Sequence, residues 1–161
     1  MKSLVVLLVF GTAAYFGWQK FSGAGAPPVI EDPVYAEIRG TANIQDREIE
    51  MVLFGRASSD DDCRVRARRS LENALKACPS CQMQPVSCSS ELPSRYARLF
   101  DDVPIPSTYL SLTAGAADER DARIVVYGLT DAEGALMCNL LREMTLKNFR
   151  GTAHCVAASG G

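Results

Sequence analysis

The sequence predicts an α+β fold: a mostly antiparallel sheet with two helices on one face, stabilised by disulfides and preceded by an N-terminal membrane anchor. Three observations lead to this prediction. Short segments with alternating apolar residues are separated by turns, two longer segments have helical spacing after good N-caps, and six cysteines all follow an apolar start. The 161 residues fit one domain of ordinary size.

The N-terminal stretch "MKSLVVLLVFGTAAYFGWQKF" is uncharged over residues 3–18 and is flanked by lysines. We interpret residues 1–21 as a single-pass transmembrane anchor that contacts the lipid bilayer through residues 3–21. The alternative is a cleaved signal peptide, whose A-x-A site at residues 24–26 lies far from the apolar run. Both interpretations predict that the rest of the chain is exported.

Residues 22–33, "SGAGAPPVIEDP", are predicted to be a linker of small residues and prolines. The folded domain is predicted to span residues 34–157, and residues 158–161 to be a flexible tail. The formal net charge of -2 argues against a general nucleic-acid binder, because such proteins need a clustered basic surface. We therefore expect no nucleic-acid partner.

The first half of the domain predicts a hairpin, a helix and a further strand. Apolar residues alternate on both sides of a polar stretch at 43–47, as expected of two paired strands. Ser58 and Ser59 offer N-caps for a helix, the run Asp60–Asp62 complements its dipole, and Pro79 ends it. The predicted bounds are 34–39 and 48–55 for the hairpin strands, 60–77 for the helix and 82–88 for the strand.

The second half repeats this order after a segment that contains a brief helical turn at residues 94–100. Thr130 and Glu133 form the T-x-x-E pattern of a capping box at the start of the second helix. The order ββαβ followed by ββαβ favours a duplication, although chance resemblance between strand-to-helix junctions stays open. The predicted bounds are 108–113 and 122–128 for the strands, 130–149 for the helix with its cap and 151–156 for the last strand.

The cysteines predict three disulfides and an oxidising compartment, most simply a bacterial periplasm. A strand that returns antiparallel to the preceding helix ends beside the beginning of that helix. This geometry predicts Cys63–Cys88 and Cys138–Cys155, which leaves Cys78 and Cys81 to pair with each other. The alternative is six free cysteines in a cytosolic domain.

The motif Cys78-Pro79-Ser80-Cys81 has three interpretations. A redox cysteine usually lies at a helix N-terminus, where the dipole lowers the thiol pKa, whereas Cys78 follows the end of a helix. A metal site would need Cys88 and His154 as further ligands, and no second C-x-x-C completes the set. We favour a structural disulfide and keep Cys78 and Cys81 as candidate redox residues. No cofactor, metal site or catalytic residue is predicted.

Two surfaces are candidates for binding. Aromatic residues and arginines dominate interface hot spots, and the segment 92–109 combines both types. The alternative for this segment is a crossover that packs its aromatics over the sheet. A second candidate is an arginine-rich outer face on the first helix, for which the alternative is an ordinary solvated face balanced by Asp60–Asp62. Its arginines are Arg64, Arg66, Arg68 and Arg69. The candidate interface residues in the segment are Arg95, Tyr96, Arg98, Leu99, Phe100 and Tyr109.

The sequence therefore favours a non-enzymatic binding or assembly module with a protein partner. Its place would be the inner membrane, with the C-terminal domain in the periplasm. The alternative function is a periplasmic thiol-disulfide oxidoreductase or metallochaperone that uses Cys78 and Cys81.

Overall fold

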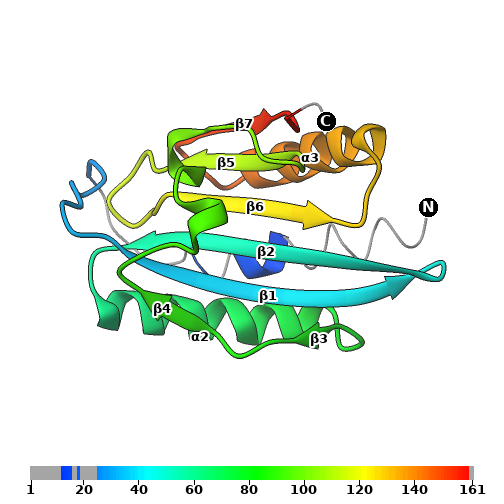
Figure 1. The fold of residues 1–161 in the computed structure, drawn as a ribbon. Helices are drawn as coiled ribbons and strands as arrows, with labels where there is room; N and C mark the ends of the chain where they lie inside the picture. Colours follow the sequence, from blue (N-terminus) through cyan, green and yellow to red (C-terminus); the bar gives the residue numbers. More distant parts are fainter. Residues whose placement is uncertain (1–11, 16–17, 19–24, 160–161) are drawn as a thin grey trace.

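The computed structural model describes residues 12–15, 18 and 25–159, which form an α+β fold with one antiparallel sheet (Figure 1). The sheet has seven strands in the order β3-β1-β2-β6-β5-β7, and β4 pairs with β1. In chain order the elements are β1 (Val34–Ile44), β2 (Arg47–Ala57), α2 (Asp60–Ala77), β3 (Gln82–Met83), β4 (Ser87–Ser89), η1 (Ser94–Tyr96), η2 (Leu99–Asp101), β5 (Tyr109–Thr113), β6 (Ala122–Tyr127), α3 (Asp131–Leu146) and β7 (Thr152–Val156).

The hairpin of β1 and β2 is longer than predicted. Gln45 and Asp46 make its turn with positive φ angles of 51° and 62°, which is the left-handed geometry of a two-residue hairpin turn. The sequence pattern ended the first strand at Arg39 because the residues that follow are small or polar. Backbone pairing with β2 continues to Ile44, because the hydrogen bonds between strands do not require apolar side chains.

The strand predicted at residues 82–88 is instead two short strands, β3 and β4, which pair with different parts of β1. Pro85 lies between them. Proline has no backbone N–H to donate to a ladder, so the pairing is interrupted there. The other predicted strands form within one or a few residues of the expected bounds.

Both helices begin with the predicted caps. The Ser59 side chain accepts a hydrogen bond from the Asp62 N–H at the start of α2. Thr130 and Glu133 form the complete capping box of α3, in which each side chain accepts a bond from the other residue's backbone N–H. The Cys78 N–H donates to the Ala74 carbonyl and closes the end of α2.

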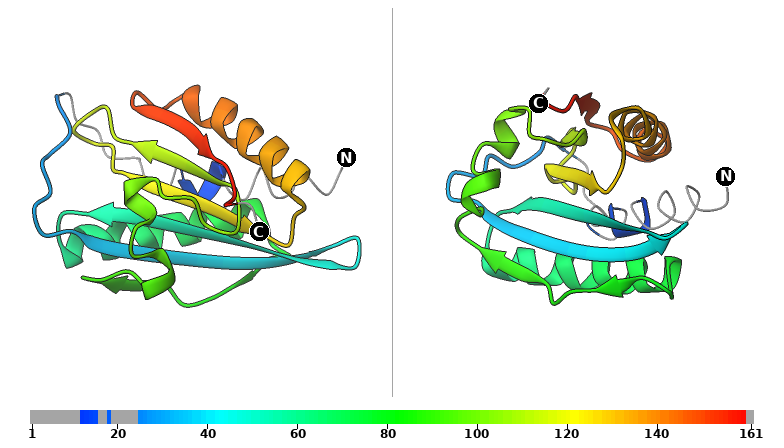
Figure 2. Two further views of the ribbon diagram at one scale, coloured as in Figure 1. Left: turned by 45° about the horizontal axis from the view of Figure 1, so that its top comes forward. Right: turned by 45° about the vertical axis from the view of Figure 1, so that its right-hand side comes forward.

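The two helices cover the same face of the sheet, as predicted, and we call it the helix face (Figure 2). Alternate residues of the central strands bury their side chains here, and the cysteines of both helices lie among them. The main contributors to this core are Ile38, Ile49, Met51, Leu53, Leu110, Leu112, Ile124, Met137 and Leu141.

The opposite face carries a second core beneath residues 92–108, which we call the crossover. It lies across the sheet in front of β2 and β6 in Figure 1 and contains the turns η1 and η2. Val52, Phe54 and Val125 bury their side chains under it, so the two central strands are buried on both faces. The core residues that the crossover itself and the start of β5 contribute are Tyr96, Leu99 and Tyr109.

All six cysteines form the three predicted disulfides, Cys63–Cys88, Cys78–Cys81 and Cys138–Cys155. Two of them join a helix to the strand that follows it, across 25 and 17 residues of sequence. The third spans a separation of three residues at the end of α2. The first two therefore fix the helices on the sheet edges, while the third constrains only a turn.

The predicted membrane anchor, residues 1–21, lies mostly outside the described residues. Among the part of the chain that is described, no helix is long and apolar enough to cross a membrane. Residues 12–15 and 18 are helical, and Tyr15 and Trp18 are fully buried on the helix face rather than projecting away from the domain. From residue 25 onward the predicted linker is mostly exposed, and its Gly25 carbonyl accepts a hydrogen bond from the Ala117 N–H.

We predict that Cys63–Cys88 and Cys138–Cys155 contribute most of the stability that the three disulfides give to the folded domain. The double substitutions Cys63→Ala/Cys88→Ala and Cys138→Ala/Cys155→Ala should each lower the free energy of unfolding by about 2–5 kcal/mol. Cys78→Ala/Cys81→Ala should lower it less, because its ring restricts the unfolded chain least. Urea unfolding without reductant measures all three. An equal loss for the third pair would contradict the assignment of a minor role to it.

We also predict a pH-dependent contribution from the capping box of α3. Hydrogen bonds from Arg47 and Thr130 lower the pKa of Glu133 from 4.5 to about 2. Since the folded pKa is the lower one, ionised Glu133 stabilises the fold above pH 4.5, and this stabilisation is lost as the pH falls toward 2. Glu133→Gln should therefore destabilise the protein at pH 7 and have little effect near pH 2.

The matched control is Glu143→Gln, which changes an exposed glutamate on the same helix. Thermal melts at both pH values measure the difference from the unsubstituted protein. A Glu133→Gln effect of the same size at pH 2 and pH 7 would show that the ionised carboxylate is not what stabilises the helix start.

Candidate functional site

The Cys78–Cys81 disulfide lies at the C-terminal end of α2, where helix carbonyls rather than N–H groups are exposed. Cys78 is 1% exposed and Cys81 is half-buried. The Ser80 hydroxyl oxygen lies 3.8 Å from the Cys78 sulfur, and Lys76 is the basic residue of the last turn. A thiolate at Cys78 would gain no stabilisation from the helix dipole, so the geometry disfavours an easily attacked, low-pKa thiol.

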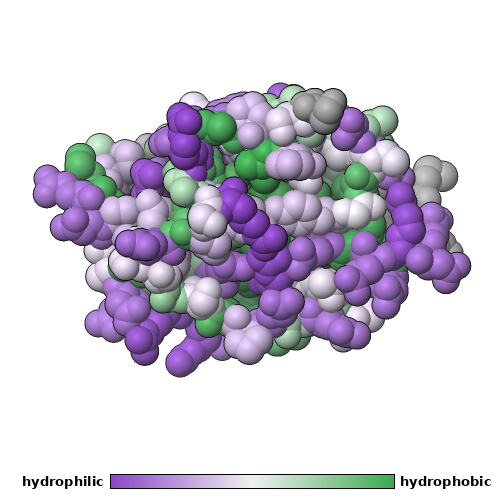
Figure 3. Space-filling model, in the orientation of Figure 1, coloured by the Kyte–Doolittle hydropathy of each residue, from purple (hydrophilic) through white to green (hydrophobic). Residues whose placement is uncertain are grey.

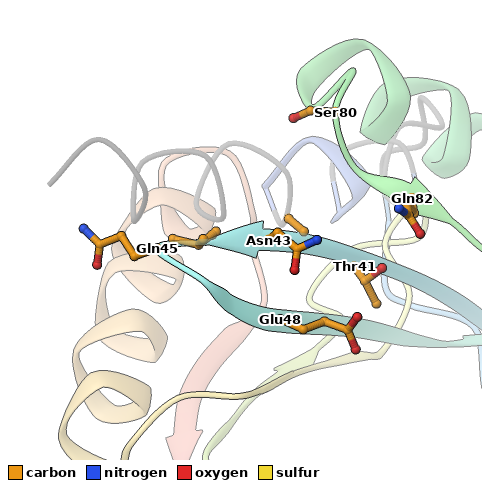
Figure 4. Close-up of a pocket in the computed structure, with 8 residues that line it drawn as sticks. Thr41, Asn43, Gln45, Glu48, Ser80 and Gln82 are labelled. Atoms are coloured by element: carbon orange, nitrogen blue, oxygen red, sulfur yellow. The ribbon is translucent and has the colours of Figure 1, made fainter.

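A polar hollow of about 350 Å³ lies beside this disulfide, between the tip of the β1–β2 hairpin and β3. Figure 4 shows its side chains spread along the hairpin, with Gln45 and Ser80 well apart, rather than directed at one point. Glu48 is the carboxylate in its lining. Across the described residues, no group of histidine, cysteine, aspartate or glutamate side chains could hold a metal ion. The residues of this hollow are Thr41, Ala42, Asn43, Ile44, Gln45, Glu48, Ser80 and Gln82.

The predicted interface segment divides into buried and exposed residues. Tyr96, Leu99 and Tyr109 are almost completely buried in the second core, so they do not lie on a contact surface. This matches the alternative interpretation of the segment as a crossover packed over the sheet. Arg95 and Arg98 are exposed, and the Arg95 guanidinium lies 4.6 Å from the centre of the Tyr96 ring.

Phe100 is half-buried and is held between cations. The guanidinium groups of Arg56 and Arg123 lie 4.8 Å and 4.7 Å from the centre of its ring, and the Tyr35 ring is 5.3 Å away. Such stacked contacts are worth about 0.5–2 kcal/mol each. Phe100 therefore contributes to attachment of the crossover, and its substitution would disturb the fold.

Arg123 is the residue that attaches the crossover to the sheet. Its side chain is 3% exposed, and its guanidinium donates hydrogen bonds to the carbonyls of Leu99 and Phe100, at 3.2 Å each. It also donates to the Leu112 carbonyl on the sheet at 2.9 Å. Burial lowers the pKa of Arg123, while the nearby Asp102 carboxylate opposes that shift. Backbone carbonyls thus accept the hydrogen bonds of the buried guanidinium, and the Asp102 carboxylate offsets its charge.

Asp102 links this buried cation to the edge of the sheet. It has left-handed backbone geometry at the end of η2, and its carboxylate lies 3.0 Å from Arg123 and 3.2 Å from the His154 Nε2 on β7. Ser111 pairs with His154 in the β5–β7 ladder, but its hydroxyl is completely buried. A serine nucleophile there would be out of reach of a substrate, so the Ser111, His154 and Asp102 set supports no hydrolytic site.

Tyr109 is buried under the crossover, at 1% exposure. Its hydroxyl donates to the Val103 carbonyl at 2.9 Å. Burial, reinforced by the negative charge of Asp102, raises its pKa to about 12. The crossover is therefore attached at its centre by buried hydrogen bonds from Tyr109 and Arg123.

The arginine-rich face predicted on α2 needs one correction. Arg66 is buried, at 2% exposure, and its guanidinium bonds to Asp62 at 2.6 Å and to the Trp18 carbonyl at 2.7 Å. Arg64, Arg68 and Arg69 are exposed, and Arg64 pairs with Asp60. The helical spacing of Cys63, Arg66, Ala67 and Ser70 already placed Arg66 on the buried stripe, so the signal was present in the sequence.

Comparison with protein-family models, with curated proteins and with solved structures found no match to this chain.

We predict that Arg123→Met loosens the crossover. It removes the guanidinium donors to the Leu99 and Phe100 carbonyls and leaves Asp102 without its buried partner. The free energy of unfolding should fall by about 3–5 kcal/mol, the usual loss when one partner of a buried ion pair is removed. Hydrogen exchange of residues 94–103 should become faster than that of β2.

The control is Arg98→Ala, whose exposed ion pair with Asp101 should contribute at most about 1 kcal/mol. If both substitutions changed stability equally, Arg123 would not be the main attachment of the crossover.

Proposed function

We propose that this protein is an exported, membrane-anchored binding or assembly module without enzymatic activity, facing the periplasm from the inner membrane. The observation that carries the proposal is that all six cysteines form disulfides. Disulfides of this number are typical of domains exported to an oxidising compartment. The apolar N-terminal run and the proline-containing linker support attachment to a bilayer.

We further propose that the outer surface of the crossover contacts a protein partner through Arg95 and Arg98. Their backbone is positioned by the buried layer around Arg123, so the two exposed arginines belong to a pre-organised segment. Figure 3 shows that the surrounding face is largely hydrophilic. A charged, polar contact with an acidic surface fits these properties better than an extended apolar contact does.

A hollow of about 330 Å³ lies at one end of the crossover. Tyr35, Phe54 and Leu92 contribute apolar surface to it, and Glu37 and Glu91 line its rim. A side chain of the partner, apolar with a polar end, would fit there. This would give the proposed interface an anchor point next to the arginines.

We propose a duplication of the ββαβ unit as the origin of the domain, because the order of the strands is symmetric about the centre of the sheet. β2 and β6 pair at the centre, β1 and β5 flank them, and the strand after each helix joins the outer edge of its own half. A duplicated scaffold would leave the crossover, which joins the halves, as the segment with no counterpart. That is where we place the partner-specific surface.

We predict that Arg95→Ala/Arg98→Ala weakens partner binding without lowering the melting temperature by more than a few degrees, because both side chains are exposed. The measurement is quantitative cross-linking in intact cells, followed by affinity capture from membranes in gentle detergent. The matched control is Arg64→Ala/Arg68→Ala, which removes the same charge from α2 on the other side of the sheet. Equal capture by both variants would exclude the crossover as the interface.

The same preparation tests the alternative function. Alkylation of the native protein should find no free thiol, and mild reductants should leave partner capture unchanged. If reduction of Cys78–Cys81 alone abolished or started an activity, the oxidoreductase or metallochaperone interpretation would replace the proposal.

A further inference from the structure

The helix face contains a groove between α2 and α3 that is filled by the N-terminal residues. Figure 2 shows residues 12–15 lying between the two helices, against the sheet, and Trp18 is buried in the same core. Ala14, Tyr15 and Trp18 belong to the main core, although at least 15 residues of sequence separate them from the first strand. This segment was predicted to lie in a bilayer, so its burial here needs an explanation.

Gly55 forms the floor of the groove beneath Trp18. A Cβ atom at Gly55 would lie 2.3 Å from the indole ring, much closer than any real contact. Neighbouring positions of β2 carry side chains, so the absence of one at residue 55 leaves a space that the indole occupies. Trp18 is 0% exposed as a result.

Arg66 forms the polar side of the groove. Its guanidinium donates to the Trp18 carbonyl at 2.7 Å and lies 5.9 Å from the centre of the indole ring. The Asp62 carboxylate and the Asp118 carbonyl hold the same guanidinium at 2.6 Å and 3.2 Å. A buried arginine is costly unless its donors are satisfied, and here a carbonyl of the N-terminal segment accepts one of its hydrogen bonds.

Tyr15 contacts the chain just after the end of α3. Its ring meets the ring of Phe149 edge to face, with centres 5.6 Å apart. Tyrosine and tryptophan three residues apart lie on the same side of a helix, so both rings can face the domain at once. The groove thus recognises two side chains and one carbonyl of a short helix.

Occupation of the groove leaves too little apolar sequence to cross a bilayer. The uncharged run begins at Ser3, so only residues 3–11 of it precede the first residue that is described in the groove. As a helix these would extend about 14 Å at 1.5 Å per residue, compared with about 30 Å of hydrocarbon. The same segment cannot fill the groove and span a membrane.

We infer that the groove between α2 and α3 is a binding site for a tyrosine and a tryptophan three residues apart, that residues 12–15 and 18 of this chain are its occupant, and that its occupation excludes insertion of these residues into a bilayer. The last part rests on the proposed function, because it matters only if the segment also serves as an anchor. In the anchored state the groove is vacant.

The experiment uses the full chain, in which Trp18 is the only tryptophan and thus reports its own position. Intrinsic fluorescence is measured with acrylamide in solution, and then with phosphatidylethanolamine and phosphatidylglycerol vesicles that contain a brominated lipid. Gly55→Ala places a methyl group against the indole, and it should raise acrylamide quenching several-fold in solution. With vesicles it should increase quenching by the brominated lipid relative to the unsubstituted chain.

The matched control is Gly134→Ala on α3, where a Cβ atom would lie at an ordinary 3.5 Å from Thr108. It should leave Trp18 quenching unchanged. Phe149→Leu is a second test, since it removes the ring that Tyr15 contacts while keeping an apolar side chain. It should also raise acrylamide quenching, and circular dichroism with a thiol count confirms that each variant is folded.

The outcomes separate the two proposals. If Gly55→Ala exposes Trp18 to acrylamide but no variant is quenched by brominated lipid, the groove stands and membrane anchoring is wrong. If Gly55→Ala and Phe149→Leu both leave acrylamide quenching as it is in the unsubstituted chain, Tyr15 and Trp18 do not occupy the groove and the inference is overturned. Strong quenching by brominated lipid together with full protection from acrylamide, unchanged by Gly55→Ala, would also overturn it.

Discussion

The pairing of β2 with β6 is the constraint on which the rest of the fold depends. It joins the two halves of the sheet and leaves both central strands apolar on both faces. Met51 and Leu53 face one side, while Val52 and Phe54 face the other. A sheet buried on both faces needs a cover on each, and the two helices cover only the helix face. The crossover and the N-terminal residues are what complete the burial.

Two buried arginines on opposite faces attach these irregular segments. Arg123 bonds to carbonyls of the crossover, and Arg66 bonds to the carbonyl of Trp18. Segments outside a sheet ladder have carbonyls without regular partners, and a guanidinium with five N–H donors can satisfy several of them. In each case an aspartate, Asp102 or Asp62, offsets the buried charge. A buried arginine paired with an aspartate therefore attaches both the crossover and the N-terminal residues to the sheet.

The sequence predicted the elements and the disulfides well, because caps, prolines and alternation are local signals. Ser59, Thr130 and Pro79 fixed helix bounds within the chain itself, and antiparallel return fixed the cysteine pairs. It could not decide whether the aromatics of the crossover face solvent or the sheet. That depends on Arg123, a charge within an apolar strand whose partners are backbone carbonyls of a distant segment. Every residue has a backbone carbonyl, so a hydrogen bond to one cannot be recognised from the residue types in the sequence.

The N-terminal segment shows why composition alone leaves a location open. Burial of apolar surface, in a bilayer or in the groove, is favourable by a transfer free energy of about 25 cal/mol per Å². A bilayer could accept the whole run of residues 3–18, and the groove buries Ala14, Tyr15 and Trp18 of it. The groove offsets this difference through fit: a glycine under the indole, an aromatic edge against Tyr15 and a satisfied buried arginine. Under the proposed function, shape and hydrogen bonding, rather than hydrophobicity, would decide between the groove and a bilayer.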